Sequence, residues 1–112
     1  MKKIEAFIRK SKFDQVKEAL HNVEVNFFSY WDVTGVGTEK EGHVYRGISY
    51  STSEIQRRYL SIIVNDDFVK PTIDAILKSA ATDSVGDGKI FVLPVDEAYR
   101  IRTGEKGSNS LN

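Results

Sequence analysis

Apolar residues alternate with mostly charged residues at the start of the chain, where Ile4 and Ile8 would face the same way. This period of two predicts a strand at residues 2–9. The spacing of apolar residues then changes to that of an amphipathic helix, predicted over residues 12–22 with Ser11 as its N-cap. The chain therefore opens with a strand that leads directly into a helix.

Three further strands and a second helix follow. A run rich in aromatic and β-branched residues predicts the next strand, and a later apolar stripe at helical spacing predicts the second helix. The expected elements are a strand at 25–36, a strand at 57–64, a helix from Asp66 or Asp67 to about Ala81, a strand at 89–95 and one short helical turn at 96–100. The regular elements thus occur in the order βαββαβ.

This order predicts an α+β fold. Two right-handed crossovers give a four-stranded antiparallel sheet with both helices on one face, a ferredoxin-like sandwich. The 112 residues indicate a single domain over residues 1–112. The aromatic residues expected on the open face of the sheet are Phe7, Phe27, Tyr30, Tyr59 and Phe91. So many rings on an uncovered face indicate a partner, often a second copy of the chain.

Two segments lack an apolar period. Residues 37–56 contain three glycines and five Ser or Thr residues, which predicts a long loop between the second and third strands. Long loops inside compact domains are often functional or mobile. The polar segment 107–112 is expected to be a flexible tail that frays.

Composition narrows the function classes. The chain has 16 Lys plus Arg and 16 Asp plus Glu, and this balance argues against nucleic acid as a direct partner. It has no cysteine, which fits a reducing cytoplasm. The first ten residues do not resemble a signal peptide, and no apolar run approaches the roughly 20 residues of a membrane span. We expect a cytoplasmic protein that does not insert into membranes.

The sequence gives little support for an enzyme. His21 and His43 are its two histidines; His21 is expected to be a solvated residue near a helix end, and His43 has no evident partner. Motifs of metalloproteases, α/β-hydrolases and P-loop proteins are absent from the sequence. The third strand also lacks the Gly and aromatic pattern with which RNA-recognition domains stack bases.

Glycines and cations gather where the second strand ends and the fourth begins. Gly35 and Gly37 close one strand, and Gly86-Asp87-Gly88-Lys89 opens the other. Glycine-rich backbone can bring N–H groups close to phosphate oxygens, and Lys89 would add a charge. Arg100 and Arg102 would point the same way in an extended segment, and guanidinium groups suit phosphate. Ordinary turns and a solvated charged face are the competing interpretations.

The same residues carry a family resemblance. GDGKIFVLPVDEAYRIRTGE resembles the C-terminal signature of the PII nitrogen-regulatory signalling proteins, MKKIEAFIRKSKFDQVKEAL their first strand and helix, and YRGISY the tip of their long T-loop. The likeness covers residues 1–107. It implies a homotrimer, not an enzyme, that binds ATP or ADP between subunits, in many members with Mg and 2-oxoglutarate. The T-loop of such proteins docks on ammonium transporters or nitrogen-metabolism enzymes.

The resemblance also implies roles for individual residues. Thr38 and Val64 would line the nucleotide cleft with Gly35, Val36 and Gly37, and Ser29 would lie near the adenine. The phosphates would be held by Gly86, Asp87, Gly88 and Lys89, and by Arg100 and Arg102 from the neighbouring subunit. In the effector loop, Arg46 matches an arginine that enters the channel mouth, and Tyr50 matches a tyrosine that some members uridylylate.

The chain departs from the family at several of these positions. Glu39 replaces a glutamine that helps hold the magnesium chelated by 2-oxoglutarate, and a carboxylate there would repel that dicarboxylate. Thr38 replaces an arginine, Arg57 a loop lysine, and Ser61 a glutamate that contacts the adenine amino group. We therefore expect weak or absent 2-oxoglutarate binding. The alternative is a PII-like interaction module that senses a different small ligand.

Overall fold

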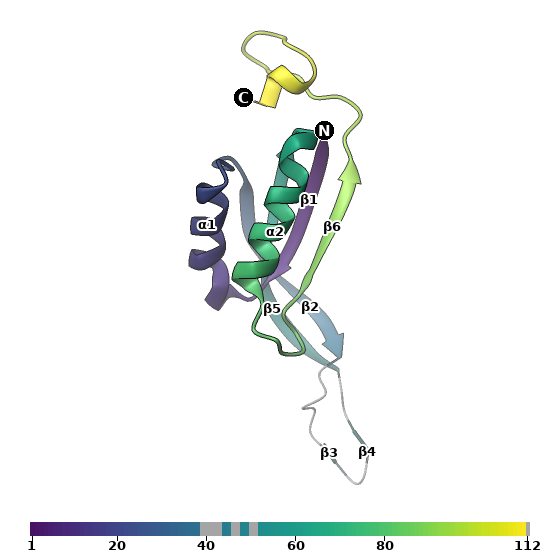
Figure 1. Ribbon diagram of the computed structural model, residues 1–112. Helices are drawn as coiled ribbons and strands as arrows, with labels where there is room; N and C mark the ends of the chain where they lie inside the picture. Colours follow the sequence, from purple (N-terminus) through teal and green to yellow (C-terminus); the bar gives the residue numbers. More distant parts are fainter. Residues whose placement is uncertain (39–43, 46–47, 50–51, 112) are drawn as a thin grey trace.

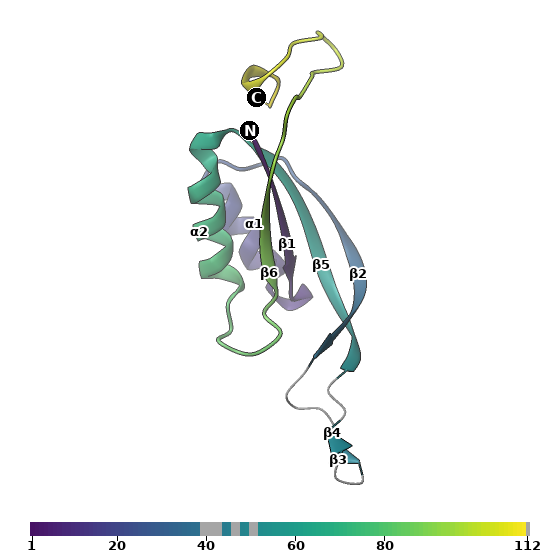
Figure 2. The ribbon, with the colours of Figure 1, turned by 90° about the vertical axis from the view of Figure 1, so that its right-hand side faces the viewer.

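The computed structural model describes the backbone of residues 1–38, 44–45, 48–49 and 52–111, and the side chains of residues 1–37 and 54–111. Within these ranges a four-stranded sheet carries two helices, α1 and α2 (Figures 1 and 2). The elements are β1 (Lys2–Ile8), η1 (Lys10–Lys12), α1 (Phe13–Asn22), β2 (Ser29–Thr38), β3 (Val44–Tyr45), β4 (Ile48–Ser49), β5 (Thr52–Val64), η2 (Asp66–Phe68), α2 (Val69–Ala80), β6 (Lys89–Pro94) and η3 (Ser108–Leu111).

The sheet has the order β2-β5-β1-β6, and all three strand pairs are antiparallel. Both helices cover the same face of this sheet, as Figure 2 shows. The predicted α+β ferredoxin-like arrangement is confirmed. Two features matter for function: β2 and β5 continue together as a two-stranded ribbon as far as the pair Thr38–Thr52, and β3 and β4 form a separate small hairpin between them.

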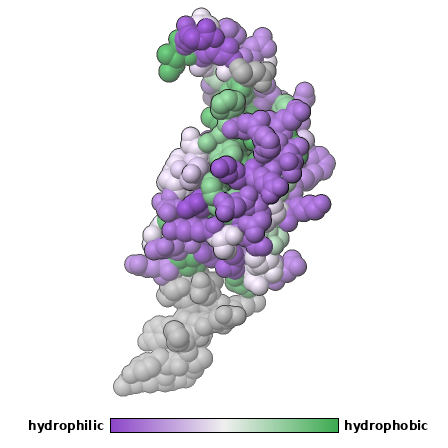
Figure 3. All heavy atoms as spheres, turned by 90° about the vertical axis from the view of Figure 1, so that its left-hand side faces the viewer, coloured by the Kyte–Doolittle hydropathy of each residue, from purple (hydrophilic) through white to green (hydrophobic). Residues whose placement is uncertain are grey.

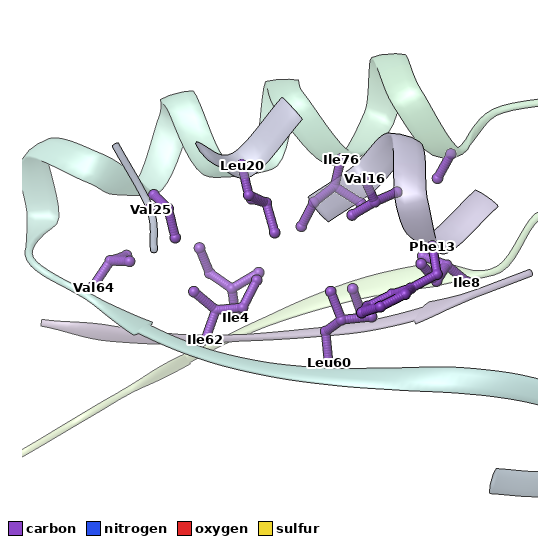
Figure 4. Close-up of a cluster of buried hydrophobic side chains, with 12 residues drawn as sticks. Ile4, Ile8, Phe13, Val16, Leu20, Val25, Leu60, Ile62, Val64 and Ile76 are labelled. Atoms are coloured by element: carbon purple, nitrogen blue, oxygen red, sulfur yellow. The ribbon is translucent and has the colours of Figure 1, made fainter. Parts of the chain in front are cut away.

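The core lies between the helices and the sheet (Figure 4). Ile4 and Ile8 of β1 and Leu60 of β5 face Val16 and Ile76 of the two helices, and each of these side chains is at most 2 % exposed. The alternation predicted for the first strand therefore has a physical cause, because every second residue enters this core. The opposite side of α1 is mostly hydrophilic (Figure 3).

The open face of the sheet carries an aromatic cluster made of Phe7, Trp31, Tyr59 and Phe91. The ring centroids of Phe7 and Tyr59 lie 5.0 Å apart, those of Phe7 and Phe91 6.2 Å apart, and those of Trp31 and Tyr59 4.5 Å apart. Such contacts stabilise a sheet face beyond simple area burial. Of the five rings predicted for the open face, Phe7, Tyr59 and Phe91 are thus confirmed.

The predictions for Tyr30 and Phe27 were wrong. Tyr30 is paired with Leu60 and contacts Phe13 of α1 at 4.5 Å, so it lies on the helix side. Phe27 precedes β2 and is 83 % exposed. Trp31 lies on the open face in place of Tyr30, because adjacent residues of a strand point to opposite faces.

Helix starts also differ from the prediction. A short 3-10 turn precedes each helix, so that α1 begins after Lys12 and α2 after Phe68, in both cases without a side-chain cap. Ser11 is therefore not the N-cap of α1. Asp66 and Asp67 do not cap α2, because both lie within η2.

Strand ends and the last segment differ as well. β2 begins at Ser29 rather than at residue 25, and β5 begins at Thr52, so the paired strands extend into the segment predicted as loop. The helical turn predicted at 96–100 is absent from this described segment; Tyr99 instead forms an isolated bridge with Lys106. In the segment predicted to fray, Ser108–Leu111 forms a 3-10 helix.

Candidate functional site

A cavity of about 550 Å³ opens beside the base of the β2–β5 ribbon. Its walls come from residues 33–37 of β2, Ile55 and Arg57 of β5, Phe7 of β1, and residues 85–86 and 88–89 before and at the start of β6. The predicted residues Gly35, Val36, Gly37, Gly86, Gly88 and Lys89 all line it. The two glycine-containing segments, about 50 residues apart in sequence, therefore meet at one place.

The segment of residues 82–88, here called the glycine loop, needs its glycines. Gly86 and Gly88 have φ angles of 99° and 107°, a region that side-chain-bearing residues rarely adopt. A β-carbon on Gly88 would overlap the backbone carbonyl of Phe7. The loop thus rests directly on the end of β1, and the guanidinium groups of Arg9 and Arg57 lie where a side chain of Gly86 would stand.

Asp87 faces away from the cavity walls and holds the loop together. The hydroxyl and the backbone N–H of Thr82 both donate to its carboxylate, the latter at 2.7 Å. Arg9 Nε donates to Asp87 Oδ1 at 3.0 Å, and Arg9 Nη2 donates to the carbonyl of Val85 at 2.9 Å. These hydrogen bonds, those from Thr82 above all, hold the pKa of Asp87 well below its ordinary value of 3.8.

Arg57 links β5, the strand that follows the effector loop, to the glycine loop. Its Nη2 donates to the carbonyl oxygen of Gly86 at 2.8 Å, and its Nη1 to the carbonyl oxygen of Gln56 at 2.8 Å. A guanidinium group and the exposed Lys89 therefore stand on two sides of one cavity. Two cations beside glycine backbone form an arrangement suited to an anion such as phosphate.

Sequence reasoning missed Arg9. The residue follows β1 immediately and reads as the polar end of an alternating strand. Its contacts are with residues 76 and 78 positions later. A local pattern carries no sign of such a long-range partner.

The other predicted nucleotide residues lie at the opposite end of the sheet. β6 begins at Lys89, paired with Phe7, and ends at Pro94, paired with Lys2, which is itself paired with Val64. Arg100 and Arg102 come after this far end (Figure 1), and Ser29 is the first residue of β2, whose Gly35 end lines the cavity. One chain therefore does not bring these four residues to the cavity.

The far end has its own local structure. Arg100 Nη2 donates to the carbonyl oxygen of Asn109 at 3.1 Å, and Arg102 is exposed. Val64 is 7 % exposed and borders a small cavity of about 70 Å³ with Phe27 and Asn65. The Asn65 side-chain oxygen is buried and has no hydrogen-bond partner among the described residues.

Some predicted residues cannot be placed. Glu39, Arg46 and Tyr50 lie outside the described residues, as does His43, and Thr38 is described only as the β2 residue paired with Thr52. In the part of the chain that the structure describes, no three His, Cys, Asp or Glu side chains gather as metal ligands would. Among the same residues no helix has the length and apolar character needed to cross a membrane.

Comparison with known proteins finds one family. The family model described as "Nitrogen regulatory protein P-II" matches residues 1–105. A nitrogen regulatory protein P-II of Azospirillum brasilense is 44 % identical over 113 aligned positions, covering 99 % of this chain and 100 % of the relative. The proteins of the same name from Cereibacter sphaeroides and Nostoc punctiforme are 43 % and 41 % identical, with the same coverage of both chains.

Proposed function

This chain belongs to the nitrogen regulatory protein P-II family, a family of regulatory signal transducers, and we propose that it senses adenine nucleotides and controls partner proteins through its effector loop. The proposal has three parts. ATP or ADP binds at the cavity beside the glycine loop, three copies of the chain complete the site, and the bound nucleotide selects the shape of the segment between β2 and β5.

The cavity beside the glycine loop is the observation that carries the proposal. Its 550 Å³ falls within the range of small-molecule sites. The positive φ angles of Gly86 and Gly88 give the glycine loop a backbone of the kind that can turn successive N–H groups toward phosphate oxygens. Lys89 and Arg57 supply positive charge at its wall in a chain whose formal net charge is zero. A polyphosphate fits these features better than a neutral ligand does.

A second copy of the chain would complete the site. Ser29, Val64, Arg100 and Arg102 lie at the far end of the sheet, so a head-to-tail neighbour can bring them to the cavity. Heterologous contacts of this kind close into rings. The exposed side chains of Trp31 and Phe91 on the open sheet face offer apolar surface for the contact between copies. A homotrimer satisfies both requirements.

The effector loop would transmit the signal. The β2–β5 ribbon leads from the cavity wall to this loop, and Arg57 touches both the ribbon and the glycine loop. A nucleotide that binds one loop conformation more tightly than another shifts the population toward it. The partner is a membrane ammonium transporter or a nitrogen-metabolism enzyme in the cytoplasm. Arg46 would enter the mouth of the transporter, and Tyr50 would be a site of uridylylation.

Calorimetric titration of the purified protein with Mg-ATP, with and without 2-oxoglutarate, tests the proposal. We expect binding of ATP and ADP, and little change with 2-oxoglutarate because Glu39 would repel it. Strong enhancement by 2-oxoglutarate would show that Glu39 is tolerated and that carbon status is also sensed. Absence of both ATP and ADP binding would refute the nucleotide-sensor function.

A different small ligand is the second candidate. Ser61 is paired with Ser29 at the far end of the sheet and offers a short hydroxyl there. A site with this small side chain has lost a contact to an adenine amino group. A thermal-shift screen with ATP, ADP, AMP, cyclic nucleotides and bicarbonate distinguishes the two candidates. Only the second predicts that another ligand raises the melting temperature while ATP and ADP do not.

A further inference from the structure

Two arginines, Arg9 just after β1 and Arg57 in β5, hold two consecutive carbonyl groups of the glycine loop. Arg9 Nη2 lies 2.9 Å from the oxygen of Val85, and Arg57 Nη2 lies 2.8 Å from the oxygen of Gly86. Both Nη2 atoms also lie within 3.1 Å of the point where a β-carbon of Gly86 would stand. The two guanidinium groups therefore approach the loop from the same side.

This arrangement fixes the direction of two backbone N–H groups. In a trans peptide the C=O and the following N–H point to opposite sides, and no cis peptide occurs among the described residues. Because the carbonyl groups of Val85 and Gly86 point at the arginines, the N–H groups of Gly86 and Asp87 point away from them. Successive N–H groups turned outward together form an anion-binding nest.

Asp87 makes the pair of arginines possible. Two guanidinium groups this close repel each other, and the repulsion is weakened only if a negative charge lies beside them. The Asp87 carboxylate accepts from Arg9 at 3.0 Å, and these two side chains are 23 % and 28 % exposed respectively. Thr82 holds the same carboxylate from the other side. Arg9 thus holds the loop by two hydrogen bonds, one to the Asp87 carboxylate and one to the carbonyl oxygen of Val85.

We propose that Arg9 is a positioning residue for the nucleotide site: it bonds to Asp87 and Val85, and so turns the Gly86 N–H toward the ligand. It acts through the loop and does not touch the ligand itself. This inference rests on the proposed nucleotide-binding function, but the clamp consists only of residues of this chain and can be tested without nucleotide.

The decisive variant is Arg9→Gln, compared with Lys17→Gln as a control that removes one charge from the exposed side of α1. Hydrogen exchange of the Thr82 and Ser84 amides, which donate to the Asp87 carboxylate, is measured first, without ligand. We expect roughly tenfold faster exchange in Arg9→Gln, the effect of losing one hydrogen bond to a charged group, and no change in Lys17→Gln. Unchanged exchange in Arg9→Gln would overturn the clamp.

Nucleotide affinity is measured next. We expect roughly tenfold weaker ATP binding by Arg9→Gln, with a smaller loss for AMP because AMP reaches the loop with fewer phosphates. A merely structural defect would weaken the binding of ATP and of AMP equally, and this result would refute a positioning role. Faster exchange with unchanged ATP affinity would refute it as well.

The double variant Arg9→Gln/Asp87→Asn distinguishes two ways in which Arg9 can act: through its contact with Asp87 or through its positive charge. It has the net charge of the wild type, so a purely electrostatic effect of Arg9 predicts recovery of ATP affinity. If Arg9 acts through the Asp87 contact, the double variant binds as weakly as the single variants and their effects are not additive. Recovery would overturn the proposal.

Two further outcomes are informative. If Arg9→Gln does not fold, Arg9→Lys replaces it: the single ammonium group keeps the charge but cannot reproduce the guanidinium fork, so intermediate exchange and affinity are expected. If the wild type binds neither ATP nor ADP, the proposed function fails, while the exchange measurement still decides whether Arg9 holds the loop.

Discussion

Gly88 packs against the backbone carbonyl oxygen of Phe7 so closely that no β-carbon fits between them. Gly88 also has a φ angle of 107°. The glycine loop is therefore fixed to the end of β1 by backbone contact as well as by the arginines. Phe7 belongs to the aromatic cluster of the open sheet face. The position of the loop is thus tied to the sheet face that carries the aromatic cluster.

Substitution of Gly88 by alanine should be severely destabilising. The new β-carbon would have to displace the Phe7 carbonyl, and the residue would keep a φ angle that alanine disfavours. We expect a loss of at least about 1–3 kcal/mol together with loss of nucleotide binding, measured by thermal denaturation and calorimetry.

Gly35→Ala is the matched control for stability. Gly35 lies in β2, and a β-carbon there would meet nothing within 4 Å. The free energy of unfolding of the Gly35→Ala variant should remain within about 0.5 kcal/mol of the wild-type value. Equal destabilisation by both substitutions would show that the close approach of Gly88 to Phe7 does not limit the loop.

The stability of the protein should depend on Asp87 in acid. The pKa of Asp87 is held below 3.8 by Thr82 and Arg9, so its ionised form stabilises the folded state. This contribution is complete above the unfolded-state pKa and is lost as pH falls through the lower folded-state pKa. In urea denaturation, the advantage of wild type over Asp87→Asn should be present at pH 7 and shrink below about pH 4.

Asp96→Asn tests whether this dependence belongs to Asp87. Asp96 forms no hydrogen bond or ion pair within the described part of the chain, so its substitution should change stability little at any pH. A constant difference between wild type and Asp87→Asn from pH 7 to pH 3 would contradict the assignment.

The fold was accessible from the sequence because its signals are local. The alternation from Ile4 to Ile8 and the apolar stripe of α2 both reflect one buried face, so the pattern identifies the element directly. The paired glycines likewise indicated the cavity that the structure places between them. The elements whose apolar residues repeat at a regular spacing were therefore predicted correctly.

Several errors concern features set by distant contacts. Tyr30 and Trp31 are adjacent aromatics, and only the pairing of β2 with β5 decides which of them faces the helices. The polar start of β5 forms a strand because β2 pairs with it, not because of its own alternation. Arg9 was missed for the same reason, since its partner Asp87 lies at the other end of the sequence.

Lys89 should contribute to nucleotide affinity more than other lysines do. Lys89→Ala removes a cation from the cavity wall, and a lost hydrogen bond to a charged group weakens binding roughly ten- to a hundredfold. Lys78→Ala removes an exposed lysine from the last turn of α2 and should bind ATP normally. Calorimetry measures both affinities, and light scattering checks that the oligomer is intact. Equal ATP affinity in the two variants would exclude Lys89 from the site.

Lys89 and Arg102 should act across the boundary between two copies of the chain. Lys89 begins β6, and Arg102 lies in the segment that follows the other end of this strand, so a head-to-tail ring would join Lys89 of one copy to Arg102 of the next. Lys89→Ala and Arg102→Ala homo-oligomers should each bind ATP weakly. When the two variants are unfolded, mixed in equal amounts and refolded, roughly a quarter of the junctions should contain both wild-type residues.

Recovery of tight ATP binding in the mixture is therefore the expected result, with a stoichiometry well below that of the wild type. Each mixed ring has junctions that unite an intact Lys89 with an intact Arg102, and these alone regain full affinity. If both residues served the same site from one chain, no mixed junction would contain the pair, and mixing would restore nothing. A mixture that binds as weakly as its components would thus refute the shared site, even if each single variant had lost affinity as predicted.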